Sequence, residues 1–163
     1  MARNDVALHR AESITDELDH LHTAISQRAY DLFRNHGNLW SGPMADWFDA
    51  EQQLVWKPAI ELRRKDGQFE LLAATPGVEA KDLDVQITPE DLLIKADIHH
   101  KHTAEEGAVQ VCEFTGGHLF RSVHFPEKVD PDSVMAEYRN GMLRITASIA
   151  KPVAQKKVEV TSA

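Results

Sequence analysis

The side chains best suited to bind a metal or move a proton gather in one polar stretch of the chain. They are His99, His100, His102, Glu105 and Glu106. Imidazoles and carboxylates are common metal ligands, but adjacent histidines in a polar stretch lack the spacing of a preformed site. We therefore interpret the stretch as a solvated loop and predict no metal site. Whether the three histidines bind metal or sense pH stays open at this level.

Other reactive side chains do not form a catalytic pattern. Cys112 would need histidine and acidic partners in space to act as a nucleophile, so a buried, inert cysteine is the favoured interpretation. His20 and His22 are two apart on a predicted helix and do not share a face. Asp82 and Asp84 alternate on a predicted strand with no His or Ser motif nearby. There is also no phosphate-binding glycine loop, and we predict neither enzymatic activity nor a cofactor.

Length, composition and charge are those of one domain with attached segments. The 163 residues are 42% apolar, which is enough for a sizeable core. Acidic residues outnumber basic ones by 26 to 18, and the formal charge of -8 disfavours nucleic acid as a partner. No apolar run is long enough to cross a membrane, and the first residues lack the apolar stretch of a signal peptide. We expect a cytoplasmic protein without an internal disulfide, because the chain has 1 cysteine.

The first part of the chain, residues 1–57, is predicted to be an N-terminal arm. Apolar residues recur at helical steps over 13–35, which predicts an amphipathic helix. They are Ile14, Leu18, Leu21, Ile25, Ala29 and Leu32. Residues 37–56 contain all 3 tryptophans and follow no single helix or strand period. This segment either packs against its own domain or offers an adaptable apolar surface to other chains.

From residue 58 the apolar residues recur with a period of two, which is typical of strands with one buried face. Asp66-Gly67 and Asn140-Gly141 stand where tight hairpin turns are expected, because both pairs tolerate positive φ. No helix of the length needed between parallel strands interrupts the pattern. The predicted strands are 59–62, 69–75, 83–87, 92–96, 109–112, 119–125, 134–138 and 143–149. The pattern predicts an all-β fold, an antiparallel sandwich.

Two segments resemble sequence signatures of a known family. Residues 117–126 read GHLFRSVHFP, and residues 136–143 read AEYRNGML. Both are similar, in the same order, to signatures of the alpha-crystallin domain in small heat-shock proteins of the bacterial type. The resemblance implies an antiparallel immunoglobulin-like β-sandwich, the alpha-crystallin domain, over residues 58–150. It leaves residues 151–163 as a flexible C-terminal tail, in which Val158-Glu159-Val160 resembles the family's C-terminal anchor.

The resemblance implies a dimer in which two copies exchange a strand. The segment that holds Val109 and Val111 would pair with the partner's edge strand near Ile60 and Leu62. Arg121 stands at the position of the family's structurally important arginine at the dimer interface. The alternative, that Arg121 is an ordinary surface arginine, is less favoured because of its position in the signature.

The resemblance also implies that the tail links dimers into a larger homo-oligomer. Val158 and Val160 project to the same side of an extended segment, so both could enter one groove. The groove expected from the family lies between two strands and is lined by Leu83, Val85, Ile87, Val134 and Ala136.

The function implied by the resemblance is that of an ATP-independent holdase chaperone, which binds unfolding proteins under heat or other stress and prevents their aggregation. Client proteins would contact the apolar part of the arm, namely Trp40, Met44, Trp47, Phe48 and Trp56. The expected partners are copies of the same chain and unfolding clients, with no nucleic acid and no membrane. The alternative is a co-chaperone adaptor on the same sandwich, which would bind one defined partner and stay monomeric.

Overall fold

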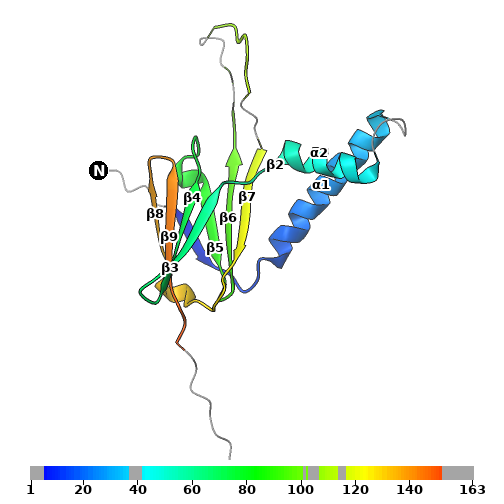
Figure 1. Cartoon of the computed structure of the whole chain (residues 1–163). Helices are drawn as coiled ribbons and strands as arrows, with labels where there is room; N and C mark the ends of the chain where they lie inside the picture. Colours follow the sequence, from blue (N-terminus) through cyan, green and yellow to red (C-terminus); the bar gives the residue numbers. More distant parts are fainter. Residues whose placement is uncertain (1–5, 37–41, 101, 103–106, 114–116, 152–163) are drawn as a thin grey trace, which may run out of the picture.

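The structure is a computed structural model that describes residues 6–36, 42–100, 102, 107–113 and 117–151. Two β-sheets lie face to face, and two helices extend from one side of this sandwich (Figure 1). The sheets hold the main hydrophobic core between them. The predicted all-β sandwich with a helical N-terminal region is confirmed.

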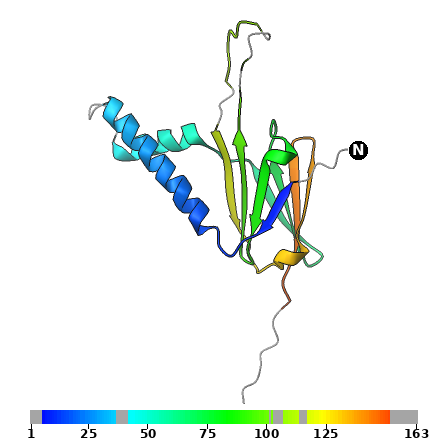
Figure 2. The same ribbon diagram turned by 180° about the vertical axis from the view of Figure 1, so that it is seen from behind.

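The larger sheet has five strands in the order β1-β5-β6-β7-β2. They are β1 (Ala7–Arg10), β5 (Leu83–Ile87), β6 (Asp91–Ile98), β7 (Gly117–His124) and β2 (Val55–Trp56). The central strands pair antiparallel, whereas β1 and β2 lie parallel to their neighbours. Figure 2 shows β1, in blue, running alongside β5. The N-terminal part of the chain therefore supplies both outer strands of this sheet.

The smaller sheet has four antiparallel strands in the order β3-β4-β9-β8. They are β3 (Ile60–Lys65), β4 (Gln68–Ala74), β9 (Met142–Ser148) and β8 (Met135–Arg139). The hairpin turns predicted at Asp66-Gly67 and Asn140-Gly141 are present, and all four residues have positive φ. A side chain at Gly141 would also crowd the backbone, because its Cβ would lie 3.2 Å from the Cα of Pro76.

The main core lies between the two sheets and follows from the period of two along the strands. In β5, Leu83, Val85 and Ile87 are at most 1% exposed, whereas the residues between them are half-buried. Phe69 and Phe125 stack inside the sandwich with ring centroids 5.6 Å apart. Burial of such side chains is the main force that holds the sheets together.

The helices α1 (Thr15–His36) and α2 (Pro43–Leu54) pack against each other outside the sandwich. Ile25, Leu32 and Ala50 are buried between them and form a second, smaller core. Within the described part of the chain, no helix is both long and apolar enough to cross a membrane. The helix predicted for residues 13–35 is thus confirmed as α1.

α2 corrects the prediction that no single period fits residues 37–56. Trp47, Ala50 and Leu54 recur at three- and four-residue steps and face α1. Pro43 begins the helix instead of preventing it. Backbone N–H groups in the first turn of a helix have no acceptor within the helix, so the N–H that proline lacks is not missed there.

Candidate interaction surfaces

The outer strand β3 offers an open backbone edge. Among the described residues it pairs with β4 alone. Ile60 and Leu62 are half-buried and pack against the main core from this edge. Arg64, further along the strand, forms an ion pair of 2.5 Å with Glu127. An open edge of this kind can accept a strand from another chain.

The long loop between β6 and β7 carries the segment expected to exchange. Val109 and Val111 are 47% and 81% exposed. The described parts of the loop extend past the end of the sandwich (Figure 1), and no described strand of the same chain pairs with them. The predicted strand 109–112 is therefore absent from the single chain, because a strand needs a hydrogen-bonding neighbour. Its pairing with a second copy stays a prediction.

Arg121 lies on β7 between Leu119 and Val123, which both belong to the main core. Alternation places Arg121 on the same inner side of the strand, where it is half-buried. Its Nε is buried and meets no hydrogen-bond acceptor within the described residues. Because a buried donor without an acceptor is unfavourable, an acceptor supplied by water or by a second chain would be stabilising.

The side of β5 that was expected to border a groove is covered by β1. The two strands run parallel, with Leu8 opposite Val85. Val6 and Leu8 are half-buried against the main core, to which the residues of β5 belong. Val134 and Ala136, the other expected wall, are half-buried against the same core. The described structure thus has β1 at the place expected for the tail.

Two polar contacts hold β1 at this place. Arg10 donates hydrogen bonds from Nη1 to both carboxylate oxygens of Asp132, at 3.2 and 3.3 Å, just before β8 begins. Nε2 of His9 lies 3.5 Å from Oδ1 of Asp84. Exposed pairs of this kind contribute about 0–1 kcal/mol each. β1 is therefore a short strand that a competing segment could displace.

The apolar residues of the arm divide into a packed set and an exposed set. Trp47 is half-buried between the helices, where its ring contacts that of His22 with centroids 4.9 Å apart. Trp56, in β2, is half-buried against the main core. Met44 and Phe48 lie on α2 and are 66% and 54% exposed. The packed interpretation therefore holds for Trp47 and Trp56, whereas Met44 and Phe48 are exposed and their contact with clients stays a prediction.

Three residues of the expected surfaces cannot be placed. Trp40, Val158 and Val160 lie outside the described residues. Their roles in client binding and anchoring stay predictions.

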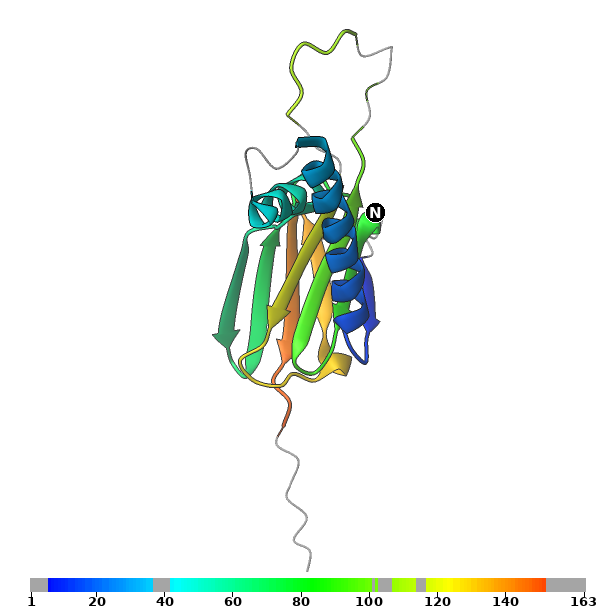
Figure 3. The same cartoon turned by 90° about the vertical axis from the view of Figure 1, so that its right-hand side faces the viewer.

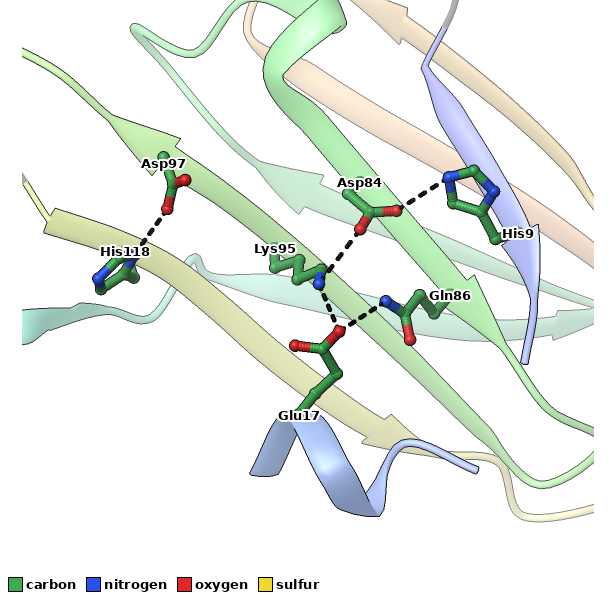
Figure 4. Close-up of polar contacts among 7 residues, drawn as sticks. All are labelled: His9, Glu17, Asp84, Gln86, Lys95, Asp97 and His118. Carbon is green, nitrogen blue, oxygen red and sulfur yellow. Dashed lines mark hydrogen bonds and ion pairs between the residues drawn. The ribbon is translucent and has the colours of Figure 1, made fainter. Parts of the chain in front are cut away.

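A polar network joins α1 to the sandwich, and Figure 3 shows α1 crossing in front of the larger sheet. The Glu17 carboxylate accepts hydrogen bonds from Lys95 Nζ at 2.6 Å and from Gln86 Nε2 at 3.2 Å (Figure 4). Lys95 Nζ also lies 3.3 Å from Asp84. The network borders a cleft of about 410 Å³ between α1 and the sheet.

Both partners of the central ion pair have shifted pKa values. The hydrogen bond from Lys95 lowers the pKa of Glu17, although partial burial acts in the opposite direction. Burial disfavours the charge on Lys95, but Glu17 and Asp84 together raise its pKa. Because the pKa of Glu17 is lower in the folded state than in the unfolded state, its ionised carboxylate stabilises the folded state. This contribution to stability is fully present above the unfolded-state pKa of about 4.3. The contribution is lost as the pH falls through the folded-state pKa.

Replacing Glu17 with glutamine is expected to loosen α1 from the sheet, because the amide cannot form the ion pair with Lys95. At neutral pH, amide hydrogen exchange in the first half of α1 should speed up by roughly 3- to 10-fold, equivalent to about 0.6–1.4 kcal/mol. After correction for intrinsic exchange rates, acidification should produce the same change in the unmodified chain but little further change in E17Q.

The matched control for this prediction is Asp16→Asn, which removes the other acidic residue of the same helical turn. Both substitutions remove a negative charge that interacts favourably with the helix dipole, so this effect is the same in the two variants. E17Q alone also loses the ion pair with Lys95. Equal acceleration in the two variants would contradict the role given to the network.

Residues 61–161 match the model of the Hsp20/alpha crystallin family, and this match extends over more than half of the 163 residues. The chain belongs to the Hsp20/alpha crystallin family. The resemblance carried by the two signatures is thus confirmed. Members of this family are small heat-shock chaperones, which are generally not enzymes.

Individual members of the Hsp20/alpha crystallin family support the same conclusion. The "Probable 15 kDa heat shock protein" of Leptospira interrogans is 33% identical over 112 residues, which are 69% of this chain and 84% of that protein. Heat shock protein 16.0 of Schizosaccharomyces pombe has a TM-score of 0.53 at 23% identity and covers 66% of this chain and 99% of its own. A small heat-shock protein from Xylella fastidiosa has a TM-score of 0.52 at 23% identity, with coverages of 66% and 98%. The two solved structures show that the sandwich has the fold of these proteins.

In this member of the Hsp20/alpha crystallin family, β1 and the surroundings of Cys112 were not predicted from the sequence. β1 has 4 residues and pairs with a strand from a distant part of the chain, so its own short sequence does not predict it. Cys112 is exposed, and the prediction that it is buried is wrong because the loop that carries it leaves the sandwich. The same loop brings Cys112 close to His100 and His102, which no spacing in the sequence indicates.

Proposed function

We propose that this chain is an ATP-independent holdase that works as a dynamic oligomer of dimers. It binds unfolding proteins under heat or other stress and prevents their aggregation. The observation that carries the proposal is the exposure of Met44 and Phe48 on a helix pair outside the sandwich. In a chain of a chaperone family, exposed apolar side chains of this size suit the irregular apolar patches of an unfolding protein.

The dimer in this proposal forms by strand exchange. The segment around Val109 and Val111 adds to the open edge of the partner's β3, beside Ile60 and Leu62. Exposure of both valines and the unpaired edge of β3 support this pairing. The buried Nε of Arg121 supports it as well, because a partner chain could supply the missing acceptor.

The larger oligomer in this proposal forms when the tail of one dimer displaces β1 on another. Val158 and Val160 would then take the place of Val6 and Leu8 beside β5. Burial of a valine yields roughly 1.5–3 kcal/mol, whereas ordering each residue of a tail costs about 1–2 kcal/mol. A single tail therefore binds weakly, and only many tails acting together hold the oligomer. Subunits can exchange and expose the arm on heating.

Client binding in this proposal falls mainly to α2. Met44 and Phe48 are exposed in the folded chain, whereas Trp47 and Trp56 are held in place by packing. Loosening of the helix pair on heating would add Trp47 to the client-binding surface, whereas exposure of Trp56 would also require β2 to leave the edge of β7. Affinity for each site would be low, and many sites in one oligomer would raise it.

Replacing Met44 and Phe48 together with serine is expected to weaken protection of a client. A heat-labile model enzyme is heated with and without the chain, and its aggregation is followed by light scattering. The unmodified chain should suppress scattering at a stoichiometric ratio, equally with and without ATP. The M44S/F48S variant should need several-fold more chain for the same effect, because the exposed apolar area of α2 is reduced.

A matched control removes two exposed methionines of the sandwich, Met135→Ser and Met142→Ser, which are 64% and 41% exposed in the original chain. This control should protect as well as the unmodified chain. Full aggregation of the client with the unmodified chain would overturn the holdase and favour an adaptor with one defined partner.

A further inference from the structure

One loop brings together three side chains that commonly bind metals. The ligand atoms of His100, His102 and Cys112 lie within 4.8 Å of one another, and all three residues are exposed. The rings of His100 and His102 meet edge to face at 86°, with centroids 4.7 Å apart. The two histidines come from the start of the loop between β6 and β7, whereas Cys112 comes from its return.

We propose that His100, His102 and Cys112 bind one zinc ion. Zinc binds imidazole nitrogen at about 2.0–2.1 Å and thiolate sulfur at about 2.3 Å, so ligand atoms around a tetrahedral zinc are about 3.3–3.7 Å apart. Separations of up to 4.8 Å therefore need to shrink by at most about 1.5 Å. Exposed side chains reach this by rotation. A water molecule takes the fourth position, as is usual for zinc with three protein ligands.

The donor set selects zinc among the common metal ions. Calcium and magnesium require oxygen ligands, and an iron–sulfur cluster requires several thiolates. Imidazole together with thiolate suits zinc, and copper(I) is the main competitor. On binding, the sulfur–zinc bond forms as the thiol proton leaves to the solvent, and no oxidation state changes.

A bound zinc would tie the end of β6 to the segment before β7. His100 follows closely after Ile98, the last residue of β6. Val111 is the neighbour of Cys112 in the sequence, so the ion would restrict the segment whose exchange between copies is proposed above. This effect on exchange rests on the proposed function, whereas metal binding itself does not.

The test is a calorimetric titration of the full, metal-free and reduced chain with zinc chloride. We expect one zinc per chain with a micromolar or tighter dissociation constant. Cys112→Ser should weaken binding by more than about 10-fold, and the double variant His100→Gln, His102→Gln should abolish it. The matched control His99→Gln, which changes the adjacent exposed histidine, should bind within about twofold of the unmodified chain.

Cobalt(II) supplies a second readout that reports the sulfur ligand directly. The cobalt-loaded chain should show the absorption band of a thiolate–cobalt bond, and Cys112→Ser should lose it. The proposal would be overturned if the chain bound no zinc, or if the cysteine and double histidine variants bound zinc as well as the unmodified chain. A cobalt spectrum without this band would also overturn it. Binding with an unchanged dimer content would support the site and contradict only its link to strand exchange.

Discussion

Replacing Val158 and Val160 with aspartate is expected to reduce the oligomer to dimers. A valine buried in the site beside β5 contributes roughly 1.5–3 kcal/mol, whereas a carboxylate there would be strongly unfavourable. Ordering the tail already costs about 1–2 kcal/mol per residue, so without the valines no net attraction is left. Light scattering after size-exclusion chromatography should show the mass fall to twice that of the 18.3 kDa chain.

The matched control for the tail is Thr161→Asp with Ser162→Asp, which adds the same charge next to the motif and should keep the oligomer. Leu8→Asp should act in the opposite direction and slow subunit exchange. It detaches β1 and leaves the site beside β5 to the tail. An unchanged mass in V158D/V160D would contradict anchoring by the tail. Faster exchange in L8D would contradict competition with β1.

Replacing Val109 and Val111 with aspartate is expected to split the dimer into single chains. Both side chains are exposed in the single chain, so the sandwich should keep its thermal stability. Burial of two valines at an interface yields about 3–6 kcal/mol, and its loss should raise the dimer dissociation constant by more than about 100-fold. Sedimentation in a V158D/V160D background, where only dimers remain to dissociate, measures this constant.

Ala108→Asp with Gln110→Asp is the matched control for the exchanged strand. It places the same charges at the alternate positions, which face the other side of an added strand, and should weaken the dimer far less. An undiminished dimer in V109D/V111D would rule out pairing through this segment and leave the open edge of β3 to another partner.

The sandwich was predictable from the sequence because its strands and turns are indicated by patterns within short segments of the chain. Buried residues alternate with more exposed ones along β4, β5 and β9, and the turns at Asp66-Gly67 and Asn140-Gly141 have the residue types that positive φ demands. The two signatures around Arg121 and Tyr138 then indicated the family, which the match over residues 61–161 confirmed.

The features that escaped prediction depend on contacts between distant segments. β1 exists because β5 offers an edge, and a run of 4 residues has too little pattern to predict. α2 was hidden by Gly42-Pro43, which resembles a helix break but here begins a helix. The prediction of a strand at 109–112 was wrong for the single chain. The sequence of this segment favours a strand, but the described part of the chain provides no strand that pairs with it. The positions of the tail anchor and of the dimer interface stay predictions.

Multi-angle light scattering of the unmodified chain at increasing temperature measures whether weak, repeated docking between sandwiches holds the chain in an exchanging oligomer. We expect a mass several times 18.3 kDa at ambient temperature, which falls towards that of a dimer on heating below the unfolding transition. A mass of 18.3 kDa at every temperature would contradict it.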